Sequence, residues 1–321
     1  MKIGKYITSL YLLLFAFAGC MAQNTSGGEI VPLGDPFIML HNNKYYAYGT
    51  HSDSGIEVYT SDDLKTWQKQ PQLALSKEDS YADRWFWAPE IYYIKEKKKF
   101  FMYYSADEHI CVAQSDSPLG PFKQTEKKPM LDGQAIDNSL FIDRDGTPYM
   151  TFVKFVDGDG VPGNSIWTVK LKGDLETVQP NTLIPSLQVT EAWENIWPRV
   201  VEAPFIVKHK DKYYMSYSAN SYESPFYGVG YAIADSPMGP WTKYEKNPIL
   251  QKPSRLQGVG HSAMFRDKKG KLKIVFHAHH SDTSIHPRGM YIMDVKFTND
   301  TVPVMTIGGK ITECRLKNNN R

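Results

Sequence analysis

The sequence has 321 residues, of which 41% are hydrophobic, 22% charged and 13% aromatic. Its 37 Lys and Arg residues against 35 Asp and Glu give a formal net charge of +2, which argues against a nucleic-acid binder or a polybasic membrane protein. The 20 Tyr, 15 Phe and 7 Trp residues carry far more apolar surface than a disordered chain, so we expect a large folded core.

The only strongly apolar segment lies at the N-terminus. Two lysines precede an apolar run at 11–19 that ends in small residues before Cys20. This pattern is typical of an export signal and is too short to span a bilayer stably. The Ala-Gly-Cys sequence at 18–20 also resembles the bacterial lipobox, in which the cysteine is lipidated and becomes the new N-terminus. We therefore predict an exported periplasmic or outer-membrane lipoprotein of a Gram-negative bacterium, anchored only through Cys20; plain cleavage near Ala22 is the alternative.

From about residue 27 onward the chain consists of short runs rich in Tyr, Phe, Val and Ile, separated by Gly, Asn, Asp and Pro turns. No long segment has the 3.6-residue period of a helix, which indicates an all-β protein. One pattern, a strand, a polar turn and an aromatic-rich second strand, occurs five times. The five hairpins span 35–48, 88–105, 137–152, 202–218 and 261–276.

A third strand, and usually a fourth, follows each hairpin, at a period of roughly 48 to 65 residues. Units with such exposed edges bury their faces on one another when they are arranged radially, which predicts a five-bladed β-propeller. A β-sandwich is the alternative, although sandwiches rarely repeat one hairpin pattern five times. We expect a signal peptide with a lipobox-like end at 1–20, a linker at 21–30 and one propeller domain at 31–315.

The innermost strands of a propeller run beside a central channel, so equivalent positions at their starts converge on the axis. Three carboxylates and an imidazole would then face one funnel, and each carboxylate lies within an apolar stretch. Burial and like-charge repulsion raise the pKa of at least one carboxyl group, which leaves a protonated acid beside an ionised base at neutral pH. The five positions are expected to hold Asp35, Ala88, Asp137, Glu202 and His261.

Such a pair suits glycoside hydrolysis. One carboxylic acid protonates the leaving oxygen, one carboxylate activates water or attacks the anomeric carbon, and a third can hold the acid in place. Each residue alone has an ordinary alternative, because Asp-Pro is common turn chemistry and a Glu before Ala-Pro is commonly a charge at a strand end. Their equivalent positions in the repeat favour a functional role, because crowding three carboxyl groups around one axis would destabilise the fold and is not expected of residues without a function.

Four segments resemble the signatures of glycoside hydrolase family 43. They are Gly-Asp-Pro-Phe at 34–37, Trp-Ala-Pro-Glu at 87–90, Ile-Asp-Asn-Ser-Leu-Phe at 136–141 and Val-Glu-Ala-Pro at 201–204. The resemblance extends from about 34 to 297. It implies a five-bladed propeller that hydrolyses arabinose- and xylose-containing polysaccharides with inversion of the anomeric configuration.

The resemblance also implies roles for single residues. It makes Asp35 the general base, Glu202 the general acid, and Asp137 the group that tunes and orients the acid. His261 resembles the family histidine at the channel centre, which in some members lies beside a calcium ion or its waters. Arg288 resembles the sugar-contacting arginine of the last blade. The alternatives are a hydrogen-bonded structural imidazole for His261 and a solvated loop residue for Arg288.

No cofactor is expected to be required, although the resemblance allows a structural calcium ion in the central channel, held by His261 through water. His277, His279 and His280 form a cluster that suggests a metal. Alternation places the first two on one strand face, but no third ligand follows at a recognisable spacing, which favours a polar wall of the funnel.

Aromatic side chains are expected to form the walls of the sugar site. Trp85 and Trp87 flank Phe86 just before the second inner strand. Because neighbouring side chains of a strand point to opposite faces, we expect at least one of the two tryptophans to pack in the core. Trp87 is the candidate for stacking on a pentose ring.

Two other functions are open. Retaining propellers that cleave sucrose and fructans usually carry Asn-Asp-Pro-Asn, Arg-Asp-Pro and Glu-Cys, whereas here Phe37 follows Pro36, and Glu-Cys at 313–314 lies beyond the last repeat. A catalytically inactive sugar-binding lipoprotein would have lost one of the three acids, and none is lost.

The implied partner is an arabinose- or xylose-containing oligosaccharide or polysaccharide, not nucleic acid. No β-sandwich follows the propeller, a module that many β-xylosidases of the family possess. This favours an exo-acting α-L-arabinofuranosidase, with β-xylosidase and endo-acting arabinanase or xylanase as alternatives.

Overall fold

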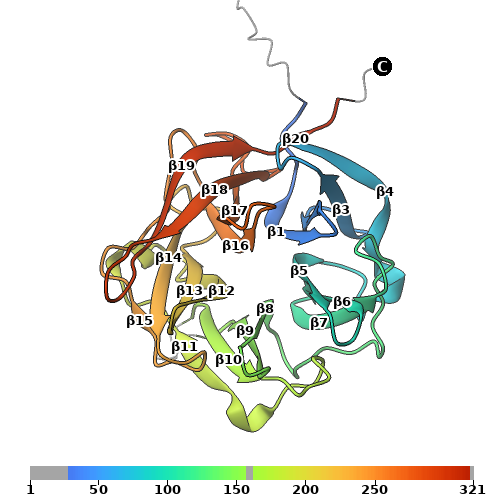
Figure 1. Ribbon diagram of the computed structural model, residues 1–321, viewed down its shortest axis with the longest axis horizontal. Coiled ribbons are helices and arrows are strands. Elements are labelled where there is room, and N and C mark those ends of the chain that lie inside the picture. The colour runs from blue at the N-terminus through green and yellow to red at the C-terminus, as the bar shows by residue number, and fades with distance from the viewer. Residues whose placement is uncertain (1–27, 157–161, 319–321) are drawn as a thin grey trace, which may run out of the picture.

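A computed structural model describes residues 28–156 and 162–318, so the predicted signal peptide and Cys20 lie outside the described residues. The described chain forms five sheets around one axis, antiparallel except for one short edge strand, which confirms the all-β, five-bladed β-propeller and excludes the β-sandwich (Figure 1). Helical structure in this part of the chain is limited to short 3₁₀ turns, none of which is long or apolar enough to cross a membrane. These turns are η1 Lys77–Asp79, η2 Pro180–Thr182 and η3 Ala192–Glu194.

Each sheet follows the chain from the axis outward (Figure 1). The first blade holds β1 Gly34–His41, β2 Lys44–Thr50, β3 Gly55–Ser61 and β4 Thr66–Ser76, and the second holds β5 Trp87–Ile94, β6 Lys99–Ala106 and β7 His109–Ser115. The third holds β8 Ile136–Ile142, β9 Pro148–Lys154, β10 Ser165–Lys170 and β11 Ile184–Leu187. The fourth holds β12 Val201–His209, β13 Lys212–Ala219, β14 Gly228–Ala234 and β15 Thr242–Lys243, and the fifth β16 Gly260–Arg266, β17 Leu272–Ala278, β18 Gly289–Phe297 and β19 Met305–Glu313.

The ends of the described chain close the ring. A short last strand, β20 Arg315–Leu316, pairs in parallel with β4 at the outer edge of the first blade. Arg315 also bridges to Ile30, and the Leu316 amide donates to the Glu29 carbonyl at 2.7 Å. The first blade is therefore built from both ends of the described chain, which joins it to the fifth blade.

Local chemistry explains the hairpins. Asn42 and Asn43, between β1 and β2, both have positive φ, as a two-residue turn of this twist requires, and Asn tolerates that backbone better than most residues. Both faces of most strands are buried, because each blade packs against two neighbours. Large aromatic rings fill these interfaces, and the largest of those that are almost fully buried include Trp67, Tyr48, Tyr59, Tyr103, Tyr104, Tyr214, Tyr217 and Tyr231.

Candidate active site

All five inner strands begin with the same backbone irregularity. β1, β5, β8, β12 and β16 each shift register against the second strand of their blade close to their start. One non-glycine residue within each shift has a positive φ between 46° and 57°. Such a bulge redirects a side chain, and strained backbone of this kind concentrates at functional sites. The kinked residues are Asp35, Ala88, Asp137, Ala203 and His261.

The structure corrects the predicted alignment of the fourth repeat by one residue. Ala203, not Glu202, has the positive φ in β12. Glu202 pairs with Ser218 just as Gly34 pairs with Thr50 in the first blade, so Glu202 precedes the kink. Proline follows the kinked residue in three blades, at positions 36, 89 and 204, and marks this register. Glu202 therefore enters the site from the position just before the kink, not from the kink itself as predicted.

One pocket of about 390 Å³ nevertheless gathers every predicted site residue. These side chains come from all five blades, so the pocket exists only when the ring is closed. The acids at 35 and 137 are 8% and 7% exposed, which places both carboxylates at its buried floor. The six predicted residues that line it are Asp35, Trp87, Asp137, Glu202, His261 and Arg288.

Asp35 is the most strongly held carboxylate of the pocket. Arg288 Nη1 donates to its Oδ1 at 2.6 Å and Nη2 to its Oδ2 at 3.0 Å. The Thr50 hydroxyl donates to Oδ2 at 2.6 Å. Burial would raise the pKa of Asp35, but the Arg288 guanidinium beside it outweighs burial and holds this pKa well below its usual value. Asp35 is therefore ionised across the physiological range.

Gly34 makes room for this ion pair. A Cβ atom at this position would lie 2.3 Å from the Arg288 guanidinium carbon, so any other residue would displace the arginine. Arg288 is 8% exposed and lies over the Tyr222 ring, with 4.7 Å from Cζ to the ring centroid. The arginine expected to contact sugar is thus bound to the Asp35 carboxylate in this structure.

Asp137 and Glu202 form an electrostatically coupled pair. Burial, together with the charges of Glu202 and Asp35, raises the pKa of Asp137 well above its usual value. Burial raises the pKa of Glu202 to about 7, although a hydrogen bond of 2.7 Å from the Tyr227 hydroxyl to Oε1 opposes the rise. Because two adjacent carboxylates do not both ionise readily, the pair retains a proton near neutral pH.

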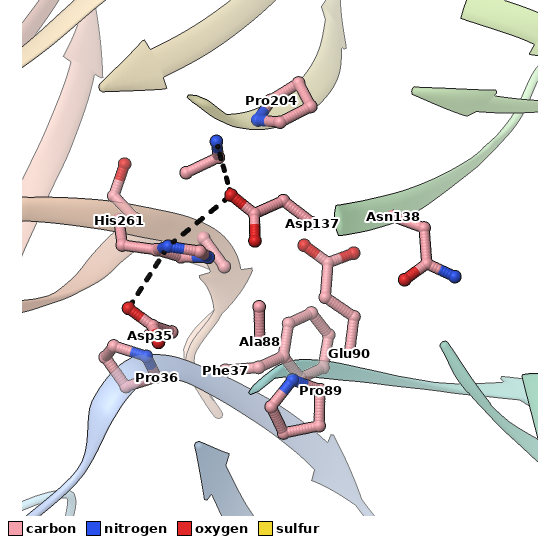
Figure 2. Close-up of a pocket in the computed structure, with 13 residues that line it drawn as sticks. Asp35, Pro36, Phe37, Ala88, Pro89, Glu90, Asp137, Asn138, Pro204 and His261 are labelled. Carbon is pink, nitrogen blue, oxygen red and sulfur yellow. Dashed lines mark hydrogen bonds and ion pairs between the residues drawn. The ribbon is translucent and has the colours of Figure 1, made fainter. Parts of the chain in front are cut away.

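Two histidines surround Asp35. His261 Nδ1 lies 3.2 Å from Asp35 Oδ1 and 3.9 Å from Asp137 Oδ2, so its ring bridges the two aspartates (Figure 2). The Asp35 amide donates to His277 Nδ1 at 3.1 Å, which assigns the His277 hydrogen to Nε2. Burial lowers the pKa of both rings, that of His277 to about 3, so both are neutral.

The tryptophans are arranged differently from the prediction. Phe86 is the core residue at 2% exposed, whereas Trp85 is 43% exposed and Trp87 is half-buried. The two indoles stack at 5.7 Å with an interplanar angle of 13°. The expectation that at least one tryptophan packs in the core is met only in part, because Trp87 packs partly buried against the core of the third and fourth blades, while the intervening Phe86 takes the fully buried position. Trp87 keeps a face in the pocket wall.

A small cavity of about 10 Å³ lies on the axis next to the pocket and shares Asp35, Asp137 and His261 with it (Figure 2). Burial raises the pKa of Glu90 in its wall to about 8, so this side chain is neutral at pH 7. The volume suits about one water molecule, whereas calcium takes roughly six to eight oxygen ligands. Among the described residues no group of three or more His, Cys, Asp or Glu side chains is arranged to hold a metal ion. The channel calcium ion, expected to be held by His261 through water, stays a prediction.

The sequence did not single out several pocket residues. They include Thr50, whose hydroxyl binds Asp35, and Glu108 and Tyr222, which lie in loops; Tyr227, which binds Glu202, was not singled out either. The sequence did contain a signal for Thr50. Ser105 and Ser218 occupy the equivalent position in their repeats, so a hydroxyl side chain recurs there in three blades. For the loop residues the sequence offers no repeat to align.

Comparison with known proteins agrees with this geometry. The model of the family described as glycosyl hydrolases family 43 matches residues 31–303. The chain is similar to the crystal structure of an endo-1,4-beta-xylanase from Bacteroides thetaiotaomicron VPI-5482, with 47% identity, a TM-score of 0.85, and coverage of 90% of this chain and 98% of that one.

Two relatives illustrate the range of activities. Beta-D-galactofuranosidase xynD of Aspergillus niger is 26% identical over 311 residues, which cover 89% of this chain and 86% of that protein. Arabinoxylan arabinofuranohydrolase of Paenibacillus polymyxa is 28% identical over 261 residues, which cover 70% of this chain and 38% of that protein.

Proposed function

The chain belongs to glycosyl hydrolases family 43 and is a glycosidase of pentose-containing carbohydrates, and from this premise we propose that it removes terminal α-L-arabinofuranosyl residues by an inverting single displacement. The observation that carries the proposal is the single pocket that combines an ionised carboxylate, Asp35, with a coupled carboxyl pair, Asp137 and Glu202, that retains a proton.

In this mechanism Asp35 is the general base. Its low pKa keeps it ionised, and Arg288 and Thr50 fix the orientation of its carboxylate. It takes a proton from the attacking water as that water adds to the anomeric carbon. Glu202, with a pKa of about 7, gives its proton to the leaving oxygen. Inversion requires roughly 6.5–9.5 Å between the two carboxyl groups, which leaves room for the water.

Asp137 completes the proposed set. Its carboxylate lies among the charges of Glu202 and Asp35, so ionisation of one acid disfavours ionisation of the next. In the proposed mechanism this repulsion helps to keep Glu202 protonated until the leaving oxygen accepts the proton. His261 bridges Asp35 and Asp137 as a neutral ring and orients both.

Pocket size and relatives support a furanoside at the end of a chain. The volume of about 390 Å³ lies near the lower end of the ~300–1,000 Å³ range of ligand pockets, which suits a terminal sugar better than a long polymer. Two relatives are named for furanosides, whereas the similar Bacteroides structure is named for a xylanase. β-D-Xylosides are therefore the second candidate, and the Trp87 indole could stack on either pentose.

We also propose that the protein is an exported lipoprotein, on the basis of the Ala-Gly-Cys sequence that ends at Cys20. Mass spectrometry of the N-terminal peptide from a Gram-negative expression host tests this proposal. A diacylglyceryl-modified Cys20 is expected, and an unmodified peptide that begins after Ala22 would contradict it.

The test of the activity uses matched aryl α-L-arabinofuranoside and aryl β-D-xyloside, with the chain that begins after Cys20 and Asp35→Asn as the blank. Release of aryl alcohol from the arabinoside alone is the expected result. Preference for the xyloside would favour the second candidate. Cleavage of neither, by folded protein, would overturn the exo-acting proposal and favour an endo-acting enzyme or a sugar-binding protein.

A further inference from the structure

A second, larger cavity lies at the opposite end of the axis from the catalytic pocket. Its volume is about 940 Å³, and among the described residues none lines both it and the catalytic pocket. A strand rises about 3.3 Å per residue, so the two ends of β1 at Asp35 and His41 lie about 20 Å apart. This second cavity, called the distal cavity below, is lined by the last residue of every inner strand: His41, Ile94, Ile142, His209 and Arg266.

Aromatic rings form much of the wall of the distal cavity. Seven Phe and Tyr side chains line it. The His209 and Phe297 rings stack across the boundary of the fourth and fifth blades, with 4.0 Å between centroids and an interplanar angle of 4°. Tyr93 and Ile142, which are 39% and 40% exposed, leave apolar surface of the wall open. Exposed apolar surface gathered in one concave place is typical of an interaction site.

The charged side chains of this wall all carry the same sign. Of the described residues that line the cavity, the charged ones are Lys208, Arg266 and Lys296, and none is an Asp or Glu. Lys208 is neutralised by Asp143, with 2.8 Å between Nζ and Oδ1. Arg266 and Lys296 are exposed and form no ion pair within the described chain, although Arg266 Nη1 donates to the Gly270 carbonyl at 2.9 Å. Two positive charges without a counter-charge therefore border an apolar wall.

These two cations lie beside the stacked rings. Lys296 directly precedes Phe297 in β18. Burial, and then the charges of Lys210 and Arg266, lower the pKa of His209, so this ring is neutral at pH 7 and adds flat surface rather than charge. A ligand ring packed on the His209 and Phe297 pair would therefore hold an attached anionic group near Arg266 and Lys296.

We propose that the distal cavity binds a planar aromatic carboxylate, with its ring on the aromatic wall and its carboxylate at Arg266 and Lys296. Aromatic rings pack favourably on one another, and a guanidinium group matches a carboxylate in shape as well as in charge. A neutral aromatic molecule would leave both cations unpaired, and an aliphatic acid would gain no ring packing. The site is separate from the catalytic pocket, so this inference does not rest on the proposed function.

The first test compares three small molecules by isothermal titration calorimetry at pH 7, with the same chain as in the activity test. The probe is 2-naphthoate, which is expected to bind saturably at one site. Naphthalene-2-carboxamide has the same shape without the charge, and octanoate has the charge without the ring. Each is expected to bind at least about threefold more weakly than the probe, and added salt should weaken only the two carboxylates.

Three outcomes of this comparison would contradict the proposal. Equal affinity for the carboxamide would overturn the role of the cations. Equal or tighter binding of octanoate would overturn the aromatic class and indicate an aliphatic ligand. If 2-naphthoate does not bind to the folded protein, the site itself is overturned.

The second test locates the probe with variants of exposed residues. Arg266→Gln/Lys296→Gln removes the two charges and is expected to weaken binding of 2-naphthoate about three- to tenfold. Lys65→Gln, at an exposed lysine on the outer edge of the first blade, is the matched control and should leave the affinity unchanged. Ile142→Asp places a negative charge in the wall and should weaken binding about tenfold or more, whereas the neutral Ile142→Asn should weaken it less.

Affinity that changes in neither R266Q/K296Q nor I142D would place the probe outside the distal cavity and overturn the proposal. Sedimentation velocity examines the other possible occupant, which is a second copy of this chain. The wild type is expected to be no more associated than I142D. A dimer that I142D dissociates would show that another copy covers the wall, and would also overturn the proposal.

Discussion

The hydroxyl of Tyr227 sets the protonation range of the proposed acid. It donates to Glu202 Oε1 at 2.7 Å, which favours the ionised carboxylate and so lowers the pKa of Glu202. Tyr227→Phe removes this bond and raises that pKa above about 7. The acid then stays protonated to higher pH, so the alkaline limb of kcat/KM should move to higher pH while the acid limb, set by Asp35, stays in place. The pH profiles of both proteins check this, and an alkaline limb that does not move would exclude Glu202 as its source.

As the proposed general acid, Glu202 should be needed only where the leaving group needs a proton. Glu202→Gln should reduce kcat by about 10²–10⁴-fold on an oligosaccharide with a sugar leaving group, because proton donation contributes about that much. On an activated aryl leaving group the loss should be much smaller. Asp35→Asn should abolish both activities, since the water is activated by the base whatever leaves. Equal losses of E202Q on the two substrates would contradict the acid assignment.

At the level of the strand, the positive φ of the inner-strand kinks makes β-branched residues costly there. Ala88, in the second blade, has a φ of 47° and is 4% exposed. Ala88→Val should lower the free energy of unfolding by about 1–3 kcal/mol, because a branched Cβ crowds this backbone. Ala88→Gly, which relieves the strain, is the control and should not destabilise to that extent. Urea unfolding measures both, and an unchanged A88V would contradict the strain at this position.

The same kinks explain what the sequence could and could not predict about the site. Repetition of Asp-Pro and Ala-Pro at strand starts located the strands that carry Asp35 and Glu202, and all the predicted residues meet in one pocket. The bulge adds a residue to the inner strand only, so its position depends on how the inner strand pairs with the second strand of the blade. In the fourth blade this pairing places Ala203, not Glu202, at the kink. Glu202 could still be found because a neighbouring position also borders the channel.

Contacts between residues of different blades could not be predicted from the sequence, for another reason. The bond between the Asp35 amide and His277 joins residues 242 positions apart, on the first and fifth blades. The stacking of Trp85 on Trp87 was missed because alternation places both indoles on one side of the chain and Phe86 on the other, and the sequence does not show which side faces the core. Alternation and repeats therefore predict elements well, whereas contacts across the axis require the closed ring.

For the whole molecule, the repeats predicted the architecture because each blade can bury its faces only against the next one. Closure of the ring then creates the site, since the pocket takes its residues from all five blades. The strand β20, bound to β4, holds the ring closed from outside, and hydrogen bonds from backbone amides of the kinked residues to side chains of the preceding blade join the blades inside. Stability and catalysis therefore depend on the same central contacts.

The central claim is that Asp35 activates a water molecule and Glu202 protonates the leaving group in one displacement. Proton NMR of the first sugar released from an α-L-arabinofuranoside, recorded before mutarotation, tests this claim most directly. The account predicts that β-L-arabinofuranose is formed first. First release of the α anomer would show a double displacement through a glycosyl-enzyme intermediate and would contradict the assignment of Asp35 as a base.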